Sequence, residues 1–362
     1  MSKYVLIDAY NIFFRALHTI SERDEEMCKR LVLHIMINMI KKACDKFSPD
    51  HLVLCCDGSG TWRKSEYPAY KLNRIEKLNQ RTTYEINRDE IAKNVFLNEL
   101  LPFLKNDTNI SVLQYQNAEA DDLVCRFVKM HPIDDIIIVS TDNDFVQLLS
   151  DHVFIYNSME DRLITNQGII ETIKNKPLKF TIKDGKVSVP KDQNKLDDSY
   201  YLPRKDWVDY LLFSKCIRGD KSDNIFSAYP GVREKSSKSK VGLMEAFEDR
   251  NNKSYAWNTF MNSTWTDADG KEHIVKDDYE FNKKLIDMNE IPEKFTQYID
   301  GYIIGALKDE PTKMVSFKLS NFLTKWDLNN LEKMISSFSE YFSKEYKGVL
   351  VDRKRELLDE SS

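Results

Sequence analysis

Three apolar, strand-like runs of this chain are each followed by an aspartate: Asp8, Asp57 and Asp142. The carboxyl ends of parallel strands meet at one edge of a sheet, where ligands bind, so we expect these carboxylates to lie close together. Close carboxylates repel one another unless cations lie between them, and hard divalent cations prefer oxygen ligands. The complete candidate set comprises Asp8, Asp57, Glu119, Asp121, Asp122, Asp142, Asp144, Asp220 and Asp223.

This acidic set predicts two-metal chemistry on a phosphodiester. Hydrolysis of that bond needs a hydroxide nucleophile at neutral pH and neutralisation of the leaving oxygen, and two divalent ions about 4 Å apart supply both. Mg²⁺ keeps several of its waters, so many carboxylates can act through water. Taken singly, each acid could instead be an exposed turn residue or a helix cap, as Asp122 and Asp144 could. The joint pattern favours the metal interpretation.

Other catalytic classes lack their residues. The six histidines form no H-E-x-x-H or similar ligand spacing. Neither a G-x-x-x-x-G-K-[ST] loop nor a G-x-S-x-G elbow occurs, so ATP hydrolysis and serine chemistry are not predicted. None of the six cysteines forms a C-x-x-C pair, and we interpret them as reduced, buried thiols.

Composition predicts a cytoplasmic protein without a membrane span. No apolar stretch of the 362 residues is long enough to cross a bilayer, and residues 5–7 are too short for a signal-peptide core. The formal net charge of −5 argues at first against a nucleic-acid partner. Without the nine candidate acids the remainder carries +4, so local patches are more informative than the global charge.

Two basic segments lie beside the acids. Residues 62–88 follow Asp57, carry a net charge of +4 and contain interleaved tyrosines, which predicts cations on phosphates and rings stacked on bases. A solvated charged loop is the alternative. A second cluster follows Asp223 and predicts contact with a duplex backbone. The candidate nucleic-acid-binding residues are Arg63, Lys64, Tyr70, Arg81, Arg233, Lys235, Lys238 and Lys240.

The elements that must position these residues alternate between strand and helix over the first 156 residues. This α/β order predicts a central, mainly parallel sheet flanked by helices. Residues 176–205 look like an insertion with a hairpin turn at 183–186. The chain from Asp206 onward has a mainly helical pattern, and residues 251–276 look like a loop or small excursion. We therefore predict two domains, 1–205 and 206–362.

Five motifs in order resemble the 5′ nuclease, or flap endonuclease, superfamily, which includes phage 5′-3′ exonucleases and the N-terminal domain of bacterial DNA polymerase I. The motifs are Leu6-Ile7-Asp8, Asp57-Gly58 with the basic segment after it, Glu119-Ala120-Asp121-Asp122, Ser140 to Leu148, and Gly219 to Ile225. The resemblance covers residues 4 to 230. Weaker similarity over 233–250 and 279–292 points to the T-even phage ribonuclease H branch.

The resemblance implies a PIN-like nuclease core with a helical arch over residues 62–95 and a helix-three-turn-helix element over 206–250. It implies that Lys71 contacts the scissile phosphate, assisted by Arg74. The usual glycine-rich hairpin after Asp223 is replaced by Pro230-Gly231-Val232-Arg233 and a Lys/Ser run, which argues against the monovalent-ion site of some relatives. It also implies a first metal near Asp8, Asp57, Glu119 and Asp121, with Asp122 close by, and a second near Asp142, Asp144, Asp220 and Asp223.

The predicted activity is a 5′-3′ nuclease using two Mg²⁺ ions, with Mn²⁺ as a substitute. Its predicted substrates are duplex 5′ ends, flaps and RNA–DNA hybrids, and its predicted task is removal of RNA primers in DNA replication and repair. We expect a phage-encoded monomer in the host cytoplasm, with a single-strand binding protein or a sliding clamp as candidate partners. Two alternatives are a PIN-type single-strand ribonuclease and a non-catalytic DNA-junction binder.

Overall fold

The chain divides into two compact units in the computed structural model. The first comprises Met1–Thr61, Arg81–Tyr200 and Lys294–Ser362, and the second comprises Trp62–Gln80 and Tyr201–Glu293. The structure describes residues 1–21, 24–78, 80–172, 181–183, 186–188, 194–197, 206–238, 240–307 and 310–348. Most of the predicted insertion, including Asp184 and Gly185 of its hairpin turn, lies outside these residues.

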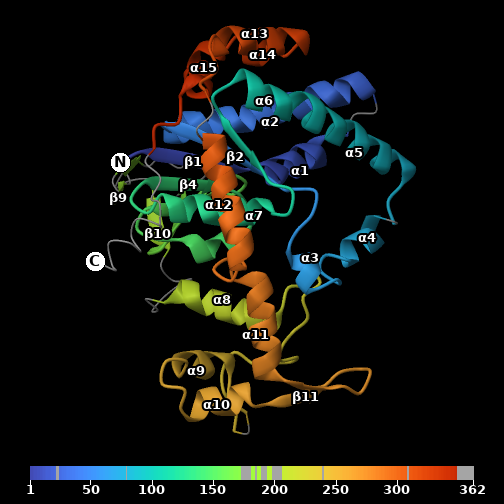
Figure 1. The fold of residues 1–362 in the computed structure, drawn as a ribbon, viewed down its shortest axis with the longest axis vertical. Coiled ribbons are helices and arrows are strands. Elements are labelled where there is room, and N and C mark those ends of the chain that lie inside the picture. Colours follow the sequence, from blue (N-terminus) through green and yellow to red (C-terminus); the bar gives the residue numbers. More distant parts are fainter. Residues whose placement is uncertain are drawn as a thin grey trace. The chain divides into compact units, whose positions relative to one another are not determined.

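The first unit is built on a sheet that has eight strands among the described residues, in the order β10-β7-β6-β5-β4-β1-β2-β3 (Figure 1). Five of them pair in parallel: β1 (Lys3–Asp8), β2 (His51–Cys56), β3 (Ser111–Gln114), β4 (Asp135–Val139) and β5 (Val153–Asn157). The mainly parallel sheet is thereby confirmed. An antiparallel extension that the sequence pattern did not predict follows: β6 (Arg162–Thr165), β7 (Gly168–Thr172) and β10 (Asn194–Asp197).

Helices cover both faces of this sheet. Val5 and Ile7 of β1 face a cluster with α1 (Ala9–Thr19) and α2 (Glu25–Phe47), whereas Tyr4 contacts Phe127 of α7 on the other face, with ring centroids 5.4 Å apart. The strands read as continuous apolar runs because both faces are buried. The other elements of this unit are α5 (Thr83–Val95), the π-helix η1 (Phe96–Leu100), α6 (Leu101–Asp107), α7 (Ala120–Met130), the 3₁₀ helix η2 (Asn143–Leu148), and the short pair β8 (Thr181–Lys183) and β9 (Lys186–Ser188).

Four C-terminal helices also belong to the first unit: α12 (Glu293–Leu307, whose first residue closes the second unit), α13 (Val315–Lys325), α14 (Asn329–Glu332) and α15 (Ile335–Ser343). Phe322 stacks on Phe103 with centroids 4.0 Å apart, and Phe338 and Phe342 are fully buried in the same core. This differs from the predicted domain 206–362. Burying such aromatic surface stabilises a fold by roughly 2 kcal/mol per side chain, which holds this segment on the first unit.

The second unit is mainly helical, with a core that contains Phe213, Ile217, Phe247 and Phe260. The segment 251–276, predicted as a loop or small excursion, holds a helix and a β-hairpin, so it is not a loop throughout. The elements are α3 (Arg63–Glu66), α4 (Asn73–Leu78), α8 (Trp207–Arg218), α9 (Leu243–Glu248), α10 (Tyr255–Met261), β11 (Thr264–Thr266), β12 (Glu272–Ile274) and α11 (Val275–Ile286).

Two predicted substructures can be compared with these elements. Helices α8 and α9, joined by successive turns, occupy the 206–250 segment for which a helix-three-turn-helix element was predicted. The predicted arch at 62–95 is divided, since α3 and α4 belong to the second unit and α5 to the first. Among the described residues, no helix has the length and apolarity needed to cross a membrane.

Candidate active site

The candidate site of the first unit lies at the carboxyl edge of the parallel strands. The β1–β2 register places Asp8 beside Cys55, and the β1–β4 register places Ile7 beside Val139. Asp8, Asp57 and the loop after β4 therefore leave the sheet at the same edge. This is the arrangement that the three apolar runs predicted.

Asp8 is the most buried of the strand-end aspartates. It caps α1, its Oδ1 accepting the Asn11 amide at 3.0 Å, and its Oδ2 accepts the Ser140 hydroxyl at 3.3 Å. Burial raises the pKa of Asp8 to about 7 despite the hydrogen bond from Asn11, and the charges of Asp57 and Asp142 contribute to the rise. The three carboxylates thus lie within electrostatic reach of one another, in surroundings that disfavour negative charge on Asp8.

Asp57 is held by the loop that leads into α7. Its Oδ1 accepts the Ala120 amide at 2.8 Å, at the N-terminus of that helix, where the helix dipole favours an anion. The Gly58 amide donates to the Ala118 carbonyl at 2.8 Å, and the Gly60 amide donates to the Gln116 carbonyl at 2.9 Å. A Cβ on Gly58 would lie 2.0 Å from the Tyr115 carbonyl oxygen, so only glycine permits this close approach.

The acidic motif Glu119-Ala120-Asp121-Asp122 begins α7. Glu119 is the N-cap residue, and its amide donates to the Asp122 carboxylate at 3.0 Å. Asp122 is fully buried. Its carboxylate therefore stabilises the start of the helix, which fits the capping alternative for this residue. Ligation of a metal by Glu119, Asp121 or Asp122 stays a prediction.

Asp142 and Asp144 lie in the turn that begins η2. The Asp142 amide donates to the Ser140 hydroxyl at 3.1 Å, and Asp142 Oδ1 accepts the Asp144 amide at 2.9 Å. The side chain of Asn11 donates to the Thr141 hydroxyl at 2.8 Å, which ties this turn to α1. Asp142 is solvent-exposed, in contrast to Asp8.

The donor set at this edge fits a hard divalent cation, since every candidate ligand is a carboxylate oxygen and no thiolate or imidazole takes part. Over the part of the chain that the structure describes, no three acidic, histidine or cysteine side chains are placed to hold one ion together. For several carboxylates to bind one ion directly, their side chains would have to rotate. Without rotation, they could bind it through the water molecules that Mg²⁺ commonly keeps. All six cysteines are buried free thiols, as predicted.

Two predicted second-metal ligands, Asp220 and Asp223, belong to the second unit, where cations already neutralise them. Lys215 Nζ lies 2.7 Å from Asp220, and Ser222 donates its amide and hydroxyl to the same carboxylate at 2.7 and 2.6 Å. Burial alone would raise the pKa of Asp220, but the hydrogen bonds from Lys215 and Ser222 lower it to about 2. Their convergence with the acids of the first unit stays a prediction.

Asp223 is surrounded by the residues predicted to contact the phosphate. Arg74 approaches its carboxylate to 2.6 Å and Lys71 to 3.7 Å, and Tyr70 donates its hydroxyl at 3.0 Å. The Lys71 amide donates to the Asp223 carbonyl at 2.8 Å, with Lys71 at a φ of 58°. The structure therefore brings Lys71, Arg74 and Asp223 together within the second unit.

The predicted nucleic-acid contacts need two corrections. Arg63 is buried and its Nε donates to the Leu285 carbonyl at 2.9 Å, so it stabilises the second unit instead of meeting a phosphate. The ring of Tyr70 is also buried, which prevents it from stacking on a base. Arg81 forms an ion pair with Asp89. The remaining candidates are all exposed: Lys64, Arg233, Lys235, Lys238 and Lys240.

Several residues of the site were not found from the sequence. Ser140 and Asn11 donate to Asp8, and the side chain of Gln114 donates to the Asp57 carbonyl at 3.0 Å. Ser140 and Gln114 directly follow or end a strand, and this position is the one signal that could have identified them.

This chain is similar in sequence to a described family and to known proteins. Residues 3–174 match the family described as 5′-3′ exonuclease, N-terminal resolvase-like domain. The chain is 29% identical over 229 residues to the flap endonuclease of Escherichia phage T5, covering 61% of this chain and 63% of that protein. It is 25% identical over 251 residues to DNA polymerase I of Caldicellulosiruptor bescii, covering 68% of this chain. The chain spans 24% of the length of that polymerase.

The fold is also similar to that of a solved structure. A crystal structure of the bacteriophage T5 flap endonuclease, in a pseudo-enzyme–product complex with DNA and metal ions, aligns with a TM-score of 0.55 and 18% identity. The alignment covers 84% of this chain and 98% of that one. At this level of identity the similarity concerns the fold.

Proposed function

We propose that this chain, which belongs to the 5′ nuclease superfamily, is a divalent-metal-dependent 5′-3′ nuclease. One observation carries the proposal: Asp8, Asp57 and Asp142 converge on one sheet edge, where burial and mutual repulsion raise the pKa of Asp8 to about 7. A bound cation would relieve that repulsion. The similarity to the T5 flap endonuclease supports the same assignment.

The proposed cofactor is a pair of Mg²⁺ ions, with Mn²⁺ as a substitute. Bound at the edge, such ions supply a hydroxide nucleophile and neutralise charge on the leaving oxygen. Asp8 and Asp57 are proposed to hold them, with Glu119, Asp121, Asp142 and Asp144 as further ligands. The α7 N-terminus keeps the Asp57 carboxylate in place through the Ala120 amide, and Ser140 orients Asp8. The roles of Asp220 and Asp223 stay predictions.

The proposed substrates are DNA with 5′ ends or flaps and RNA–DNA hybrids, from which RNA primers would be removed. Contact with a phosphate backbone is supported by four exposed positive side chains, Arg233, Lys235, Lys238 and Lys240. Such contacts bind nucleic acid without reading its sequence. A single-strand binding protein or a sliding clamp, a monomeric state and a phage origin remain predictions.

The discriminating experiment is cleavage of four labelled substrates: a 5′-flap DNA, a blunt duplex, an RNA–DNA hybrid and a single-stranded RNA. We expect Mg²⁺-dependent cleavage of the first three from the 5′ end, abolished by EDTA. Preferential cleavage of the single-stranded RNA would favour a PIN-type ribonuclease. Tight flap binding without cleavage under any divalent ion would favour a non-catalytic junction binder.

Lys71 is proposed to act on the reacting phosphate. Lys71→Ala should lower the turnover at saturating flap substrate by roughly 10- to 100-fold, because a positive charge lost beside the transition state lowers kcat. Single-turnover cleavage measures this effect. Lys64→Ala, in the same segment but exposed, should instead weaken substrate binding. An unchanged turnover in Lys71→Ala would remove Lys71 from the site.

A further inference from the structure

Helix α12 lies more than a hundred residues beyond the matched family domain, yet it contacts the candidate site through two polar side chains. The Tyr302 hydroxyl accepts the amide of Gln114, the last residue of β3, at 2.9 Å. The ring of Tyr302 lies 5.4 Å from that of Tyr115. Asp300 accepts two hydrogen bonds from the Arg126 guanidinium of α7, both at 2.7 Å.

Asp300 and Arg126 form a bidentate, charge-assisted ion pair, which is among the strong polar contacts in proteins. Arg126 is 5% exposed, and a buried guanidinium needs a partner for its charge. A bidentate carboxylate satisfies two of its donors in a fixed geometry. Since Arg126 lies on α7, whose first residue donates its amide to Asp57, this pair fixes the helix that holds the Asp57 carboxylate.

The Tyr302–Gln114 contact reaches the same carboxylate by a second path. The Gln114 side chain donates to the Asp57 carbonyl at 3.0 Å, and the residues after Gln114 hydrogen-bond Gly58 and Gly60. The segments around Gly58 and Tyr115 are in close contact, because there is no room for a Cβ at Gly58. A shift of Gln114 therefore shifts Asp57.

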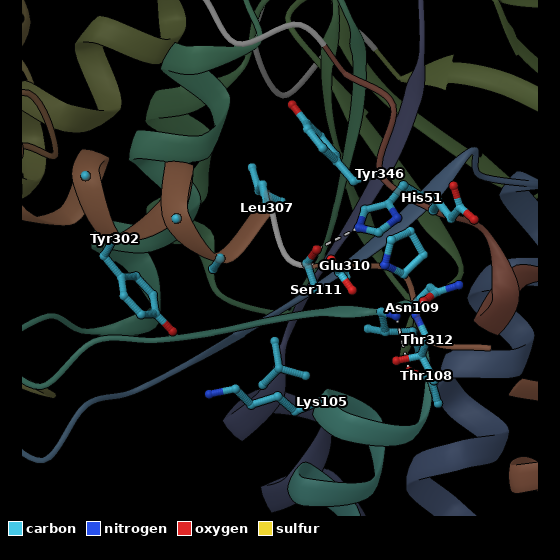
Figure 2. A pocket seen from close by; sticks show the side chains of 17 residues that line it. His51, Lys105, Thr108, Asn109, Ser111, Tyr302, Leu307, Glu310, Thr312 and Tyr346 are labelled. Carbon is cyan, nitrogen blue, oxygen red and sulfur yellow. Dashed lines mark hydrogen bonds between the residues drawn. The ribbon is translucent and has the colours of Figure 1, made fainter.

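A cavity of about 400 Å³ lies beside this contact (Figure 2). Gly301, Tyr302 and Gly305 of α12 line one side of it, and Ser111 and Val112 of β3 are also among its lining residues. Figure 2 shows Tyr302 extending from α12 toward β3. Where the cavity separates helix and strand, side-chain packing does not hold them together, so the polar contact at Tyr302 matters more.

We propose that Asp300 and Tyr302 are positioning residues, which hold the 57–60 and 115–119 loops and so keep the Asp57 and Glu119 carboxylates in place for metal binding. The proposal rests on the metal-dependent nuclease function proposed above. Partners that orient metal ligands in this way are commonly worth 10- to 100-fold in metal affinity or activity.

Tyr302→Phe tests the proposal with little change in shape. The probe is Mn²⁺ alone, bound to the full chain and followed by electron paramagnetic resonance. We expect roughly 10-fold weaker Mn²⁺ binding, because the Gln114 amide loses its acceptor. Tyr298→Phe is the matched control: it lies on the same helix, is 52% exposed, and should keep the wild-type affinity.

Two further readouts separate positioning from a general loss of stability. Without metal, hydrogen exchange in Tyr302→Phe should accelerate at the amides of Gln114, Gly58 and Gly60 but not in β4. In cleavage assays the variant should lose kcat at low Mn²⁺ and recover it at saturating Mn²⁺, with KM for flap DNA unchanged. Asp300→Asn should behave likewise, and Asp300→Glu should restore part of the affinity.

The possible outcomes are distinct. Wild-type Mn²⁺ affinity and wild-type exchange in Tyr302→Phe would overturn the proposal, as would faster exchange spread evenly over the whole sheet. If the wild-type chain binds Mn²⁺ but cleaves no substrate, the proposed function fails while the affinity difference between the variants still supports the positioning role. A wild-type chain that binds no Mn²⁺ would overturn both.

Discussion

The two edges of the central sheet differ in how their buried polar groups are stabilised. At the carboxyl edge, the pKa of Asp8 is raised to about 7 by burial and by neighbouring carboxylates. At the amino edge, His51 is held by the Ser111 hydroxyl at 2.8 Å (Figure 2). The Lys344 carbonyl lies 3.0 Å from the other ring nitrogen of His51. His131 is held by the Phe127 carbonyl at 2.7 Å and the Tyr346 hydroxyl at 2.6 Å.

This difference separates two uses of buried polarity in one sheet. The amino edge satisfies its imidazoles within the protein and keeps them neutral, since burial lowers the pKa of both His51 and His131. Such an edge contributes stability and specificity to the fold. The carboxyl edge keeps repelling charges together, which costs stability and suits a site that a cation completes.

The largest expected effect compares the same substitution at the two edges. Asp142→Asn should lower flap cleavage about 1,000-fold or more, equivalent to about 4 kcal/mol of transition-state stabilisation, while duplex binding persists. Asp151→Asn, an exposed aspartate just before β5 at the amino edge, should cleave like the wild type. Single-turnover cleavage and fluorescence anisotropy measure the two quantities. Parallel loss of binding and cleavage in Asp142→Asn would contradict this role.

The second expected effect is a loss of folding stability in acid, caused by the buried histidines at the amino edge. Burial lowers the pKa of His51 from 6.5 to about 4, so the unfolded chain takes up a proton that the folded chain refuses between these pH values. Stability is therefore full above about pH 6.5 and falls by about 3 kcal/mol as the pH drops to 4. Burial lowers the pKa of His131 as well, which adds loss in the same direction.

Urea unfolding at pH 7, 5.5 and 4.5 measures this loss. Carboxylates elsewhere also titrate in acid, so the informative quantity is the difference between the wild type and His51→Gln. That variant should show a shallower decline while retaining flap cleavage at pH 7. Equal declines in both proteins would show that His51 does not carry the effect.

The smallest expected effect concerns two glycines. Gly305 lies on the exposed face of α12 with nothing within 4 Å of an added Cβ, so Gly305→Ala should raise the free energy of unfolding by about 0.5–1 kcal/mol. Chemical denaturation checks this gain, and cleavage should be unaffected. Gly58→Ala, at the carboxyl edge, should destabilise instead, because its Cβ meets backbone. A higher free energy of unfolding in both variants would contradict the predicted difference between the two positions.

Local pattern was enough to predict the parallel strands of the first unit's sheet and the acids at their carboxyl edge, but not the antiparallel strands β6, β7 and β10. Asp8 ends β1 and Asp57 directly follows β2, and the carboxyl ends of parallel strands lie at the same edge of the sheet. The mainly helical character of the chain from Asp206 onward was also predictable from its pattern, whereas the helix-three-turn-helix element over 206–250 was implied only by the family resemblance.

Long-range contacts were not predictable in this way. Nothing in the residues around Phe322 indicates that it packs beside Phe103, because the pairing depends on the whole chain. The burial of Arg63 depends on a carbonyl contributed by Leu285, more than two hundred residues away. Likewise, Tyr302 meets Gln114 only once the helices are assembled.

The second unit is inserted between stretches of chain that share one aromatic core. A single proteolytic nick in it, for example at the exposed turn near Gly270, would leave two fragments that migrate separately on a denaturing gel yet co-elute under native conditions. For the same reason, cutting the gene short after the second unit would not yield a smaller working core. Such a truncation would remove Phe322 and expose Phe103 to solvent, and we expect the product to aggregate.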